Sequence, residues 1–291
     1  MATNFDPLDP EIPLGDTIED AVDWTIRTFD FVFDAVKAAL ETTFEATRDL
    51  LQWPPFWMMI VLFVALAWTI RSWRFAAFTA PAFYLVAAMG VWDQAMYTLA
   101  MVLVAAAMAI VLSVPLGIWA AKSSTVSNAV RPILDLMQTM PPLVYLIPMV
   151  AMFSIGVPGG IVATVIFAMP PGVRFTELAI RQVDAEVVEA GQAFGSPPRR
   201  ILRQIQLPLA LPTIMAGINQ VIMLSLSMVV LAAFIGAAGL GREVTGALSR
   251  VNVSQGVEAG IAIVILAIYL DRVVSALAER APVVRAQRVR N

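Results

Sequence analysis

Long runs without a charged residue constrain this chain more strongly than any other feature of its sequence. No Asp, Glu, Lys or Arg occurs in the stretches 50–70, 75–92, 94–121, 136–173 and 204–241, and a further apolar run covers 259–270. A helix needs about 20 apolar residues to cross a hydrocarbon core roughly 30 Å thick. Of the 291 residues only 14% are charged, against about 25% in a typical soluble domain. The sequence therefore predicts an all-α integral membrane protein.

The lengths of these runs predict seven transmembrane helices. The run 136–173 is too long for one crossing, and Gly-Val-Pro-Gly-Gly at 156–160 is a loop signal in its middle. We therefore expect spans near 54–70, 75–91, 95–120, 136–155, 160–175, 207–235 and 257–271.

The Lys and Arg residues of the short loops predict the orientation of these spans. An odd number of spans places the two termini on opposite sides of the membrane. With the N-terminus outside, 14 of the 19 basic residues lie on the cytoplasmic side and five lie outside. The reverse orientation would place most of the positive charge outside, so we expect the N-terminus outside and the C-terminus in the cytoplasm.

The N-terminal segment, residues 1–53, is acidic and amphipathic. It holds 12 acids and three bases. Its apolar residues recur every three or four positions opposite a mostly acidic face, as in a half-buried helix; they are Ile18, Val22, Ile26, Phe29, Phe33, Val36, Leu40 and Phe44. An acidic face binds anionic lipid poorly, so we favour a helix packed on the outer ends of the bundle over one that lies on the membrane surface.

Residues that the sequence lacks disfavour several classes of function. It has no Cys and no His, so we expect no thiol chemistry, no Ser-His-Asp triad and no metal site. It has no Gly-x-x-x-x-Gly-Lys-Ser/Thr loop for a nucleotide and no basic, aromatic surface for nucleic acid. The predicted spans lack the mid-membrane carboxylates typical of ion-coupled carriers. We therefore expect a protein that is not an enzyme, binds no cofactor itself and is powered from elsewhere.

The loop between the fifth and sixth spans, residues 181–208, carries the most specific pattern. Gly195 suits the left-handed end of one helix, while Ser196 suits the cap and Pro197 the first turn of a second helix. The apolar Phe194 and the basic Arg199 lie beside this turn. Small residues there would let another protein approach closely: Ala190, Gly191, Ala193 and Gly195. A solvated hairpin is the alternative interpretation.

This loop resembles the EAA loop of ABC-importer permeases, whose pattern is Glu-Ala-Ala, three residues, Gly, nine residues and Ile-x-Leu-Pro. The matching positions are Glu189, Ala190, Gly191, Gly195, Ile205, Leu207 and Pro208. The one departure is Gly191, where the pattern has Ala. In that family the loop docks into a groove on a separate ATPase and transmits its closure to the membrane spans. The resemblance implies this coupling role for the matching residues, with Phe194 and Arg199 beside them.

The resemblance extends to residues 92–273, which are similar to permeases of glycine betaine and proline betaine importers, the ProW/OpuA type. It rests on stretches such as PLGIWAAKS (115–123) and RPILDLMQTMPPLVYLIP (131–148). It implies the type I (MetI-like) permease core of five spans. We accordingly divide the chain into the acidic N-terminal segment (1–53), two accessory helices (54–91), the core with its EAA loop (92–273) and a basic cytoplasmic tail (274–291).

The same resemblance implies the partners and the cargo. We expect a homodimer in a bacterial cytoplasmic (inner) membrane, with lipid around it, ABC ATPase subunits that hold ATP and Mg inside, and an external or periplasmic substrate-binding protein. The implied cargo is a quaternary-ammonium or betaine-type compatible solute such as glycine betaine, proline betaine, choline or trimethylamine N-oxide. The alternatives are a permease for a different small solute, an ion-coupled secondary carrier and a scaffolding membrane protein.

A cationic or zwitterionic solute needs a path of weak polar and aromatic contacts rather than a deep anionic site. Pro141 and Pro142 donate no amide hydrogen, so we expect a helix break there and a gate that includes residues 138–145. For each candidate taken singly, packing or lipid contact is the alternative. The candidates for the path or gate are Trp119, Met137, Thr139, Pro141, Pro142, Tyr145, Asn219, Met223 and Ser227.

Overall fold

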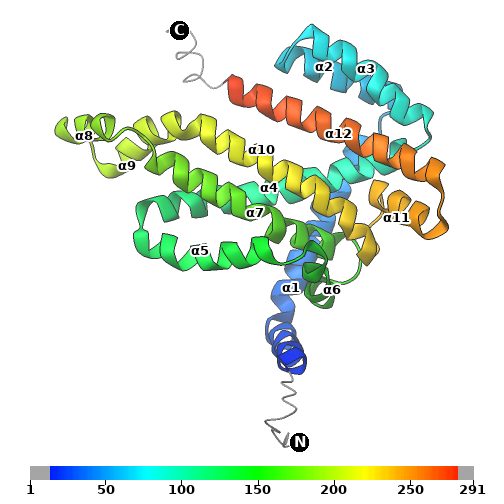
Figure 1. The fold of residues 1–291 in the computed structure, drawn as a ribbon, viewed down its shortest axis with the longest axis horizontal. Helices are drawn as coiled ribbons and strands as arrows, with labels where there is room; N and C mark the ends of the chain where they lie inside the picture. Colours follow the sequence, from blue (N-terminus) through cyan, green and yellow to red (C-terminus); the bar gives the residue numbers. More distant parts are fainter. Residues whose placement is uncertain (1–13, 281–291) are drawn as a thin grey trace, which may run out of the picture.

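The computed structural model describes residues 14–280, and every regular element in that range is helical (Figure 1). Three short turns interrupt the α-helices: η1 (Pro142–Tyr145) and η3 (Ala232–Ile235) are 3-10 turns and η2 (Leu202–Gln206) is a π-helical turn. The all-α prediction is confirmed. The α-helices are α1 (Leu14–Gln52), α2 (Phe56–Ile70), α3 (Trp73–Ala88), α4 (Trp92–Lys122), α5 (Ser124–Thr139), α6 (Leu146–Phe153), α7 (Val157–Arg181), α8 (Ala185–Ala193), α9 (Pro198–Ile201), α10 (Leu207–Leu231), α11 (Leu240–Arg250) and α12 (Val253–Glu279).

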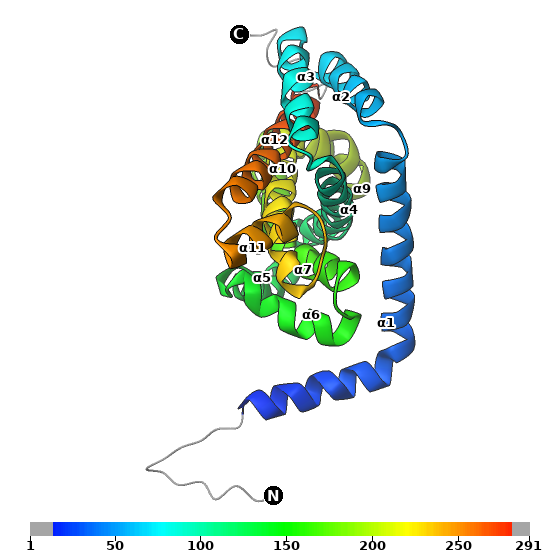
Figure 2. The same ribbon diagram turned by 90° about the vertical axis from the view of Figure 1, so that its right-hand side faces the viewer.

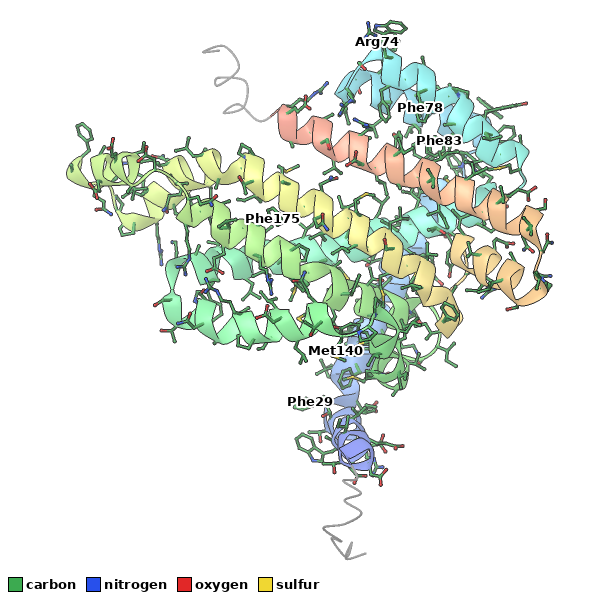
Figure 3. All side chains as sticks on the ribbon, viewed as in Figure 1. Phe29, Arg74, Phe78, Phe83, Met140 and Phe175 are labelled. Carbon is green, nitrogen blue, oxygen red and sulfur yellow. The ribbon has the colours of Figure 1, made fainter. Side chains whose placement is uncertain are left out.

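The core of the bundle is built around α7, which packs against both α4 and α10, while α12 packs against α10 (Figure 1). The close approach depends on residues without a side chain. A Cβ added at Gly172 of α7 would lie 2.3 Å from the Ser113 hydroxyl oxygen of α4. A Cβ added at Gly217 of α10 would lie 2.6 Å from Cβ of Phe175, which Figure 3 shows between α7 and α10. Small residues let transmembrane helices pack backbone to backbone.

The helices agree with most, but not all, of the predicted spans. Four segments of the described chain are long and apolar enough to cross a membrane alone: α4, α7, the continuous run Pro198–Ile235 and α12. Two bent pairs, α1 with α2 and α5 with η1–α6, raise the number to six. The predicted span that these six leave out is 75–91, which corresponds to α3; its 16 residues rise only about 24 Å at 1.5 Å per residue.

The accessory helices α2 and α3 form a hairpin that is attached to α12 by aromatic residues. The Tyr269 hydroxyl of α12 donates to the Phe63 carbonyl of α2 at 3.2 Å. The Phe83 ring lies 4.7 Å from the Phe63 ring and 5.1 Å from the Tyr269 ring. Figure 3 shows Phe83 between the hairpin and α12. The hairpin, which corresponds to the predicted spans 54–70 and 75–91, is therefore packed on the bundle.

The long helix α1 has two parts with different surroundings. A kink at Phe29, whose φ and ψ are −117° and 23°, separates them (Figure 2). The second part packs along the bundle and buries Leu40, Phe44 and Leu51. The first part turns away, and Ile18 is 56% exposed. The prediction that this segment packs on the bundle is therefore confirmed for the part of α1 after Phe29 and not for the part before it. Residues 1–13 and most of the predicted basic tail (281–291) lie outside the described residues.

Candidate functional site

The loop between α7 and α10 forms a helix, a turn and a second helix at the end of the bundle opposite α11 (Figure 1). Asp184 caps α8 by accepting a hydrogen bond from the Glu186 amide at 2.9 Å. After α8, Gly195 adopts φ +73°. The amide of Gly195 donates to the Gln192 carbonyl at 2.8 Å, and that of Ser196 to the Gly191 carbonyl at 3.1 Å, which is the Schellman pattern of helix ends. The left-handed conformation predicted for Gly195 is confirmed.

The second helix differs from its prediction. α9 begins at Pro198, with Pro197 as its N-cap and no side-chain cap, so the predicted cap by Ser196 is wrong. Nor is this helix separate, because it continues into α10 as the single run Pro198–Ile235. At the join, the Leu207 amide donates to the Leu202 carbonyl five residues earlier. Such a wide turn accommodates Pro208, which lacks an N–H and would crowd an α-helical turn. The second arm of the loop is therefore the end of a membrane-spanning helix.

Four of the matching residues hold this loop together from inside. Gly191 is buried, and a Cβ added to it would lie 2.8 Å from Cδ1 of Ile205 and 3.5 Å from Cγ1 of Ile201. Ile205, Leu207 and Pro208 are half-buried, and Leu207 packs on a buried apolar cluster shared by α7 and α10. The expectation that Gly191 admits another protein is therefore wrong, because its missing side chain admits the second arm of the same loop.

The remaining candidates form the exposed face of the loop, which we call the coupling surface: Glu189, Ala190, Phe194, Gly195 and Arg199. The Phe194 side chain is 90% exposed. The same loop has a pocket of about 330 Å³ whose lining includes three arginines; it is lined by Pro197, Arg199, Arg200, Arg203 and Gln204. This surface offers an apolar group and positive charge to a partner.

Sequence reasoning missed a buried carboxylate at the base of the loop. Glu177 of α7 is 6% exposed. Its Oε1 accepts from the Ser127 hydroxyl at 2.7 Å and lies 3.0 Å from Nε of Arg181 and 3.4 Å from Nη2 of Arg131. Because Ser127 and Arg131 belong to α5, these contacts tie α5 to α7 where α7 leads into the loop. The sequence did contain one signal for this contact. Arg181 follows Glu177 by four residues, so the two side chains lie on one helical face and can form an ion pair.

The predicted helix break at the two prolines is confirmed. α5 ends at Thr139, and η1–α6 leaves at an angle of 108° to it; Figure 3 shows Met140 at this bend. The predicted span 136–155 is therefore not one helix. In a continuous helix the Met137 carbonyl would accept from residue 141, but Pro141 has no N–H. The buried Tyr145 hydroxyl donates to that carbonyl instead, so Tyr145 joins the two arms of the broken span.

The polar path candidates bond within the chain. The Thr139 and Ser227 hydroxyls donate to carbonyls of their own helices, at 3.2 and 3.1 Å, as the packing alternative expects. The Asn219 amide of α10 donates to the Asp271 carboxylate of α12 at 2.8 Å. The other candidates differ in exposure, since Trp119 and Pro141 are exposed and Met137, Pro142 and Met223 are half-buried.

Comparison with known proteins decides which family this architecture belongs to. Residues 113–281 match the family described as binding-protein-dependent transport system inner membrane component. The chain belongs to this family of ABC-importer permeases. The permease is 50% identical over 264 residues to the glycine betaine transport system permease protein OpuAB of Bacillus subtilis (strain 168), an alignment that covers 91% of this chain and 94% of that protein.

Two further comparisons extend the likeness. The permease is 43% identical over 278 residues to the glycine betaine/proline betaine transport system permease protein ProW of Escherichia coli (strain K12), covering 94% of this chain and 78% of that protein. A solved structure titled as inward-facing conformations of the MetNI methionine ABC transporter matches with a TM-score of 0.57 and 24% identity, covering 65% of this chain and 92% of that chain. At that identity the match establishes the fold alone, and it confirms the MetI-like core.

Membership of the family establishes the general role of the chain. It is a multi-pass permease subunit of the inner membrane in an ABC importer, rather than an enzyme. Its ATPase is a separate subunit, and a substrate-binding protein is a further partner.

Proposed function

We propose that this permease imports a quaternary-ammonium or betaine-type compatible solute, of the class of glycine betaine, proline betaine, choline and trimethylamine N-oxide. The observation that carries the proposal is the 50% identity to a glycine betaine permease over nearly the whole of both chains. A trimethylamine N-oxide permease of Ruegeria pomeroyi, 36% identical over 89% of this chain, supports the wider class. A permease for a different small solute is the second candidate, because a binding protein can select the cargo.

The coupling surface is proposed to dock into the ATPase. Phe194 would enter an apolar groove, and Arg199 and its neighbours would meet acidic groups at the rim. This proposal is supported by the exposure of Phe194. It is also supported by the continuity of the second arm with α10, because any displacement of the docked loop would move a membrane-spanning helix. ATP and Mg are bound by the ATPase and not by this chain.

The arrangement in the membrane is part of the same proposal. Two copies form the translocation unit, surrounded by lipid, with the N-terminus outside and the C-terminus and the coupling surface inside. The acidic segment 1–53 lies outside, the α2–α3 hairpin is accessory, and residues 92–273 form the core. The broken span is the gate: Pro141 and Pro142 set the break, and Tyr145 holds its geometry. Trp119, Asn219, Met223 and Ser227 are candidates for the wall of the path.

Uptake of radiolabelled glycine betaine tests the cargo. The permease is expressed with its partner ATPase and binding protein in a bacterial strain that lacks betaine importers of its own. We expect ATP-dependent accumulation that persists when ionophores collapse the proton and sodium gradients, and that excess proline betaine, choline or trimethylamine N-oxide reduces. Uptake of none of these solutes by the assembled complex would contradict the cargo class. Uptake that stops with the ion gradients would contradict ATP-driven import.

A further inference from the structure

A separate aromatic pocket lies away from the coupling surface and from the broken span. It has a volume of about 420 Å³ and opens between the turn from α1 to α2, the end of α3 and the start of α4. Three aromatic side chains and one carboxylate contribute to its lining: Phe56, Tyr84, Trp92 and Asp93. These residues come from three helices, so the fold rather than the local sequence brings them together.

The back of this pocket is held in place by the core. The Trp92 ring contacts the fully buried Phe83 ring edge-on, with centroids 6.3 Å apart, and the Phe56 ring at the same distance. The Gln52 side-chain amide donates to the Asp93 carbonyl at 3.0 Å, which ties the end of α1 to the start of α4. Phe56 and Tyr84 are nevertheless 44% and 63% exposed. The aromatic surfaces are thus supported from behind and open in front.

The lining has the chemistry of a site for a bulky organic cation. Within residues 14–280, no Lys or Arg forms an ion pair with the exposed Asp93 carboxylate. Asp93 lies in the first turn of α4. A cation over aromatic faces is attracted by the ring quadrupole, and quaternary ammonium groups are recognised by such cages. A calcium or magnesium ion would need six or more oxygen ligands, whereas only one carboxylate lines this pocket.

We propose that this pocket binds a quaternary ammonium group, with Phe56, Tyr84 and Trp92 as aromatic walls and Asp93 as the counter-charge. None of the residues that line this pocket is a candidate for the translocation path, so the proposal does not rest on the cargo proposed above. Aromatic residues also gather singly at membrane interfaces, but here they converge with a free carboxylate. Two sources present the same trimethylammonium group: a dissolved betaine-type solute and the choline headgroup of phosphatidylcholine.

The test measures binding of choline and of its uncharged carbon isostere, 3,3-dimethyl-1-butanol. The full permease with its ATPase is placed in nanodiscs of phosphatidylethanolamine and phosphatidylglycerol, and binding is followed by saturation-transfer NMR of the methyl groups. We expect the isostere to bind roughly fivefold more weakly or worse, because it lacks the charge. Tyr84→Leu and Asp93→Asn should each weaken choline binding by about three- to fivefold. Equal binding of the two probes would overturn the proposal.

Matched variants separate this pocket from other sites. Trp57→Leu removes an aromatic ring of α2 that is 59% exposed but does not line the pocket, and should leave choline binding unchanged. Asp93→Asn keeps the shape of the side chain, so it tests the site even if Tyr84→Leu fails to fold. Choline binding that neither variant changes would place the ammonium elsewhere and overturn the proposal. Loss of this binding in phosphatidylcholine nanodiscs identifies the lipid headgroup as the occupant, and unchanged binding identifies a dissolved solute; either supports the site.

Discussion

Gly191 and Gly195 both belong to the loop between α7 and α10, but they lack a side chain for different reasons. Gly195 has open space around the position of a Cβ and a φ of +73°. Gly191 has helical geometry, and a Cβ there would meet the side chains of the second arm. The first glycine permits the turn, and the second permits the two arms to pack.

Substitutions at Gly191 should therefore depend on size. The Cβ of Gly191→Ala comes closer than ordinary contact only to the terminal methyl of Ile205, which can shift. The substitution also gains about 1 kcal/mol of helix propensity, so we expect a stability within ~1 kcal/mol of the native chain. Gly191→Leu should cost about 1–3 kcal/mol by overpacking and displace α8. Thermal unfolding of the solubilised permease measures both. Equal stability of the Leu variant and the native chain would show that α8 does not pack as described.

Tyr145 offers a second prediction for a single residue. Tyr145→Phe keeps the ring but leaves the Met137 carbonyl without the hydroxyl that donates to it. We expect a loss of about 1–2 kcal/mol in the free energy of unfolding and slower uptake. Thr69→Val in α2 is the control, because it removes an exposed hydroxyl that donates only to the Leu66 carbonyl of its own helix, outside the broken span. Similar stability and transport of the Phe and Val variants would remove Tyr145 from the account of the gate.

The broken span makes a prediction for an element. Replacing both Pro141 and Pro142 with Ala restores the amide donors and lets α5 extend, so transport should change while the assembly with the ATPase persists. Pro148→Ala is the control, because it removes a proline from α6, in the same broken span, without changing the two prolines at the bend. Uptake rates and copurified ATPase are measured together. An unchanged uptake rate in the double variant would exclude the break from the gating step.

The sequence predicted elements well where one local signal dominated. The break followed from two adjacent prolines, and the end of α8 followed from Gly195. The second arm was predicted as a helix separate from the span near 207–235, because charged residues precede the uncharged run that starts at Gln204, whereas the π-helical turn joins the arm and the span into one run. Glu177 was missed because the fifth span was ended by its last apolar residue, although α7 continues to Arg181. The contacts of Glu177 with α5 join distant segments, and periodicity within one helix cannot report such contacts.

At the scale of the whole molecule, the orientation is open to a direct test. The chain has no Cys, so a single introduced Cys reports one position without background. Ser254→Cys, at the exposed start of α12, should react with a membrane-impermeant maleimide in intact cells. Gln192→Cys, on the exposed end of α8, should react only after the cells are permeabilised. The opposite labelling pattern would place the coupling surface outside and contradict the proposed topology.

The central claim is that the coupling surface binds a separate ATPase. Its most direct test is affinity purification of the permease from its native membrane, with mass spectrometry of the bound proteins, for the native chain, Gly195→Asp and Gly90→Asp. Gly195 and Gly90 have φ of +73° and +74° and equally open surroundings, so the two substitutions impose a similar backbone cost at different places. We predict an ABC ATPase with the native chain and Gly90→Asp, and its loss with Gly195→Asp. Recovery of the folded native chain without an ATPase, or equal ATPase with both variants, would contradict the account.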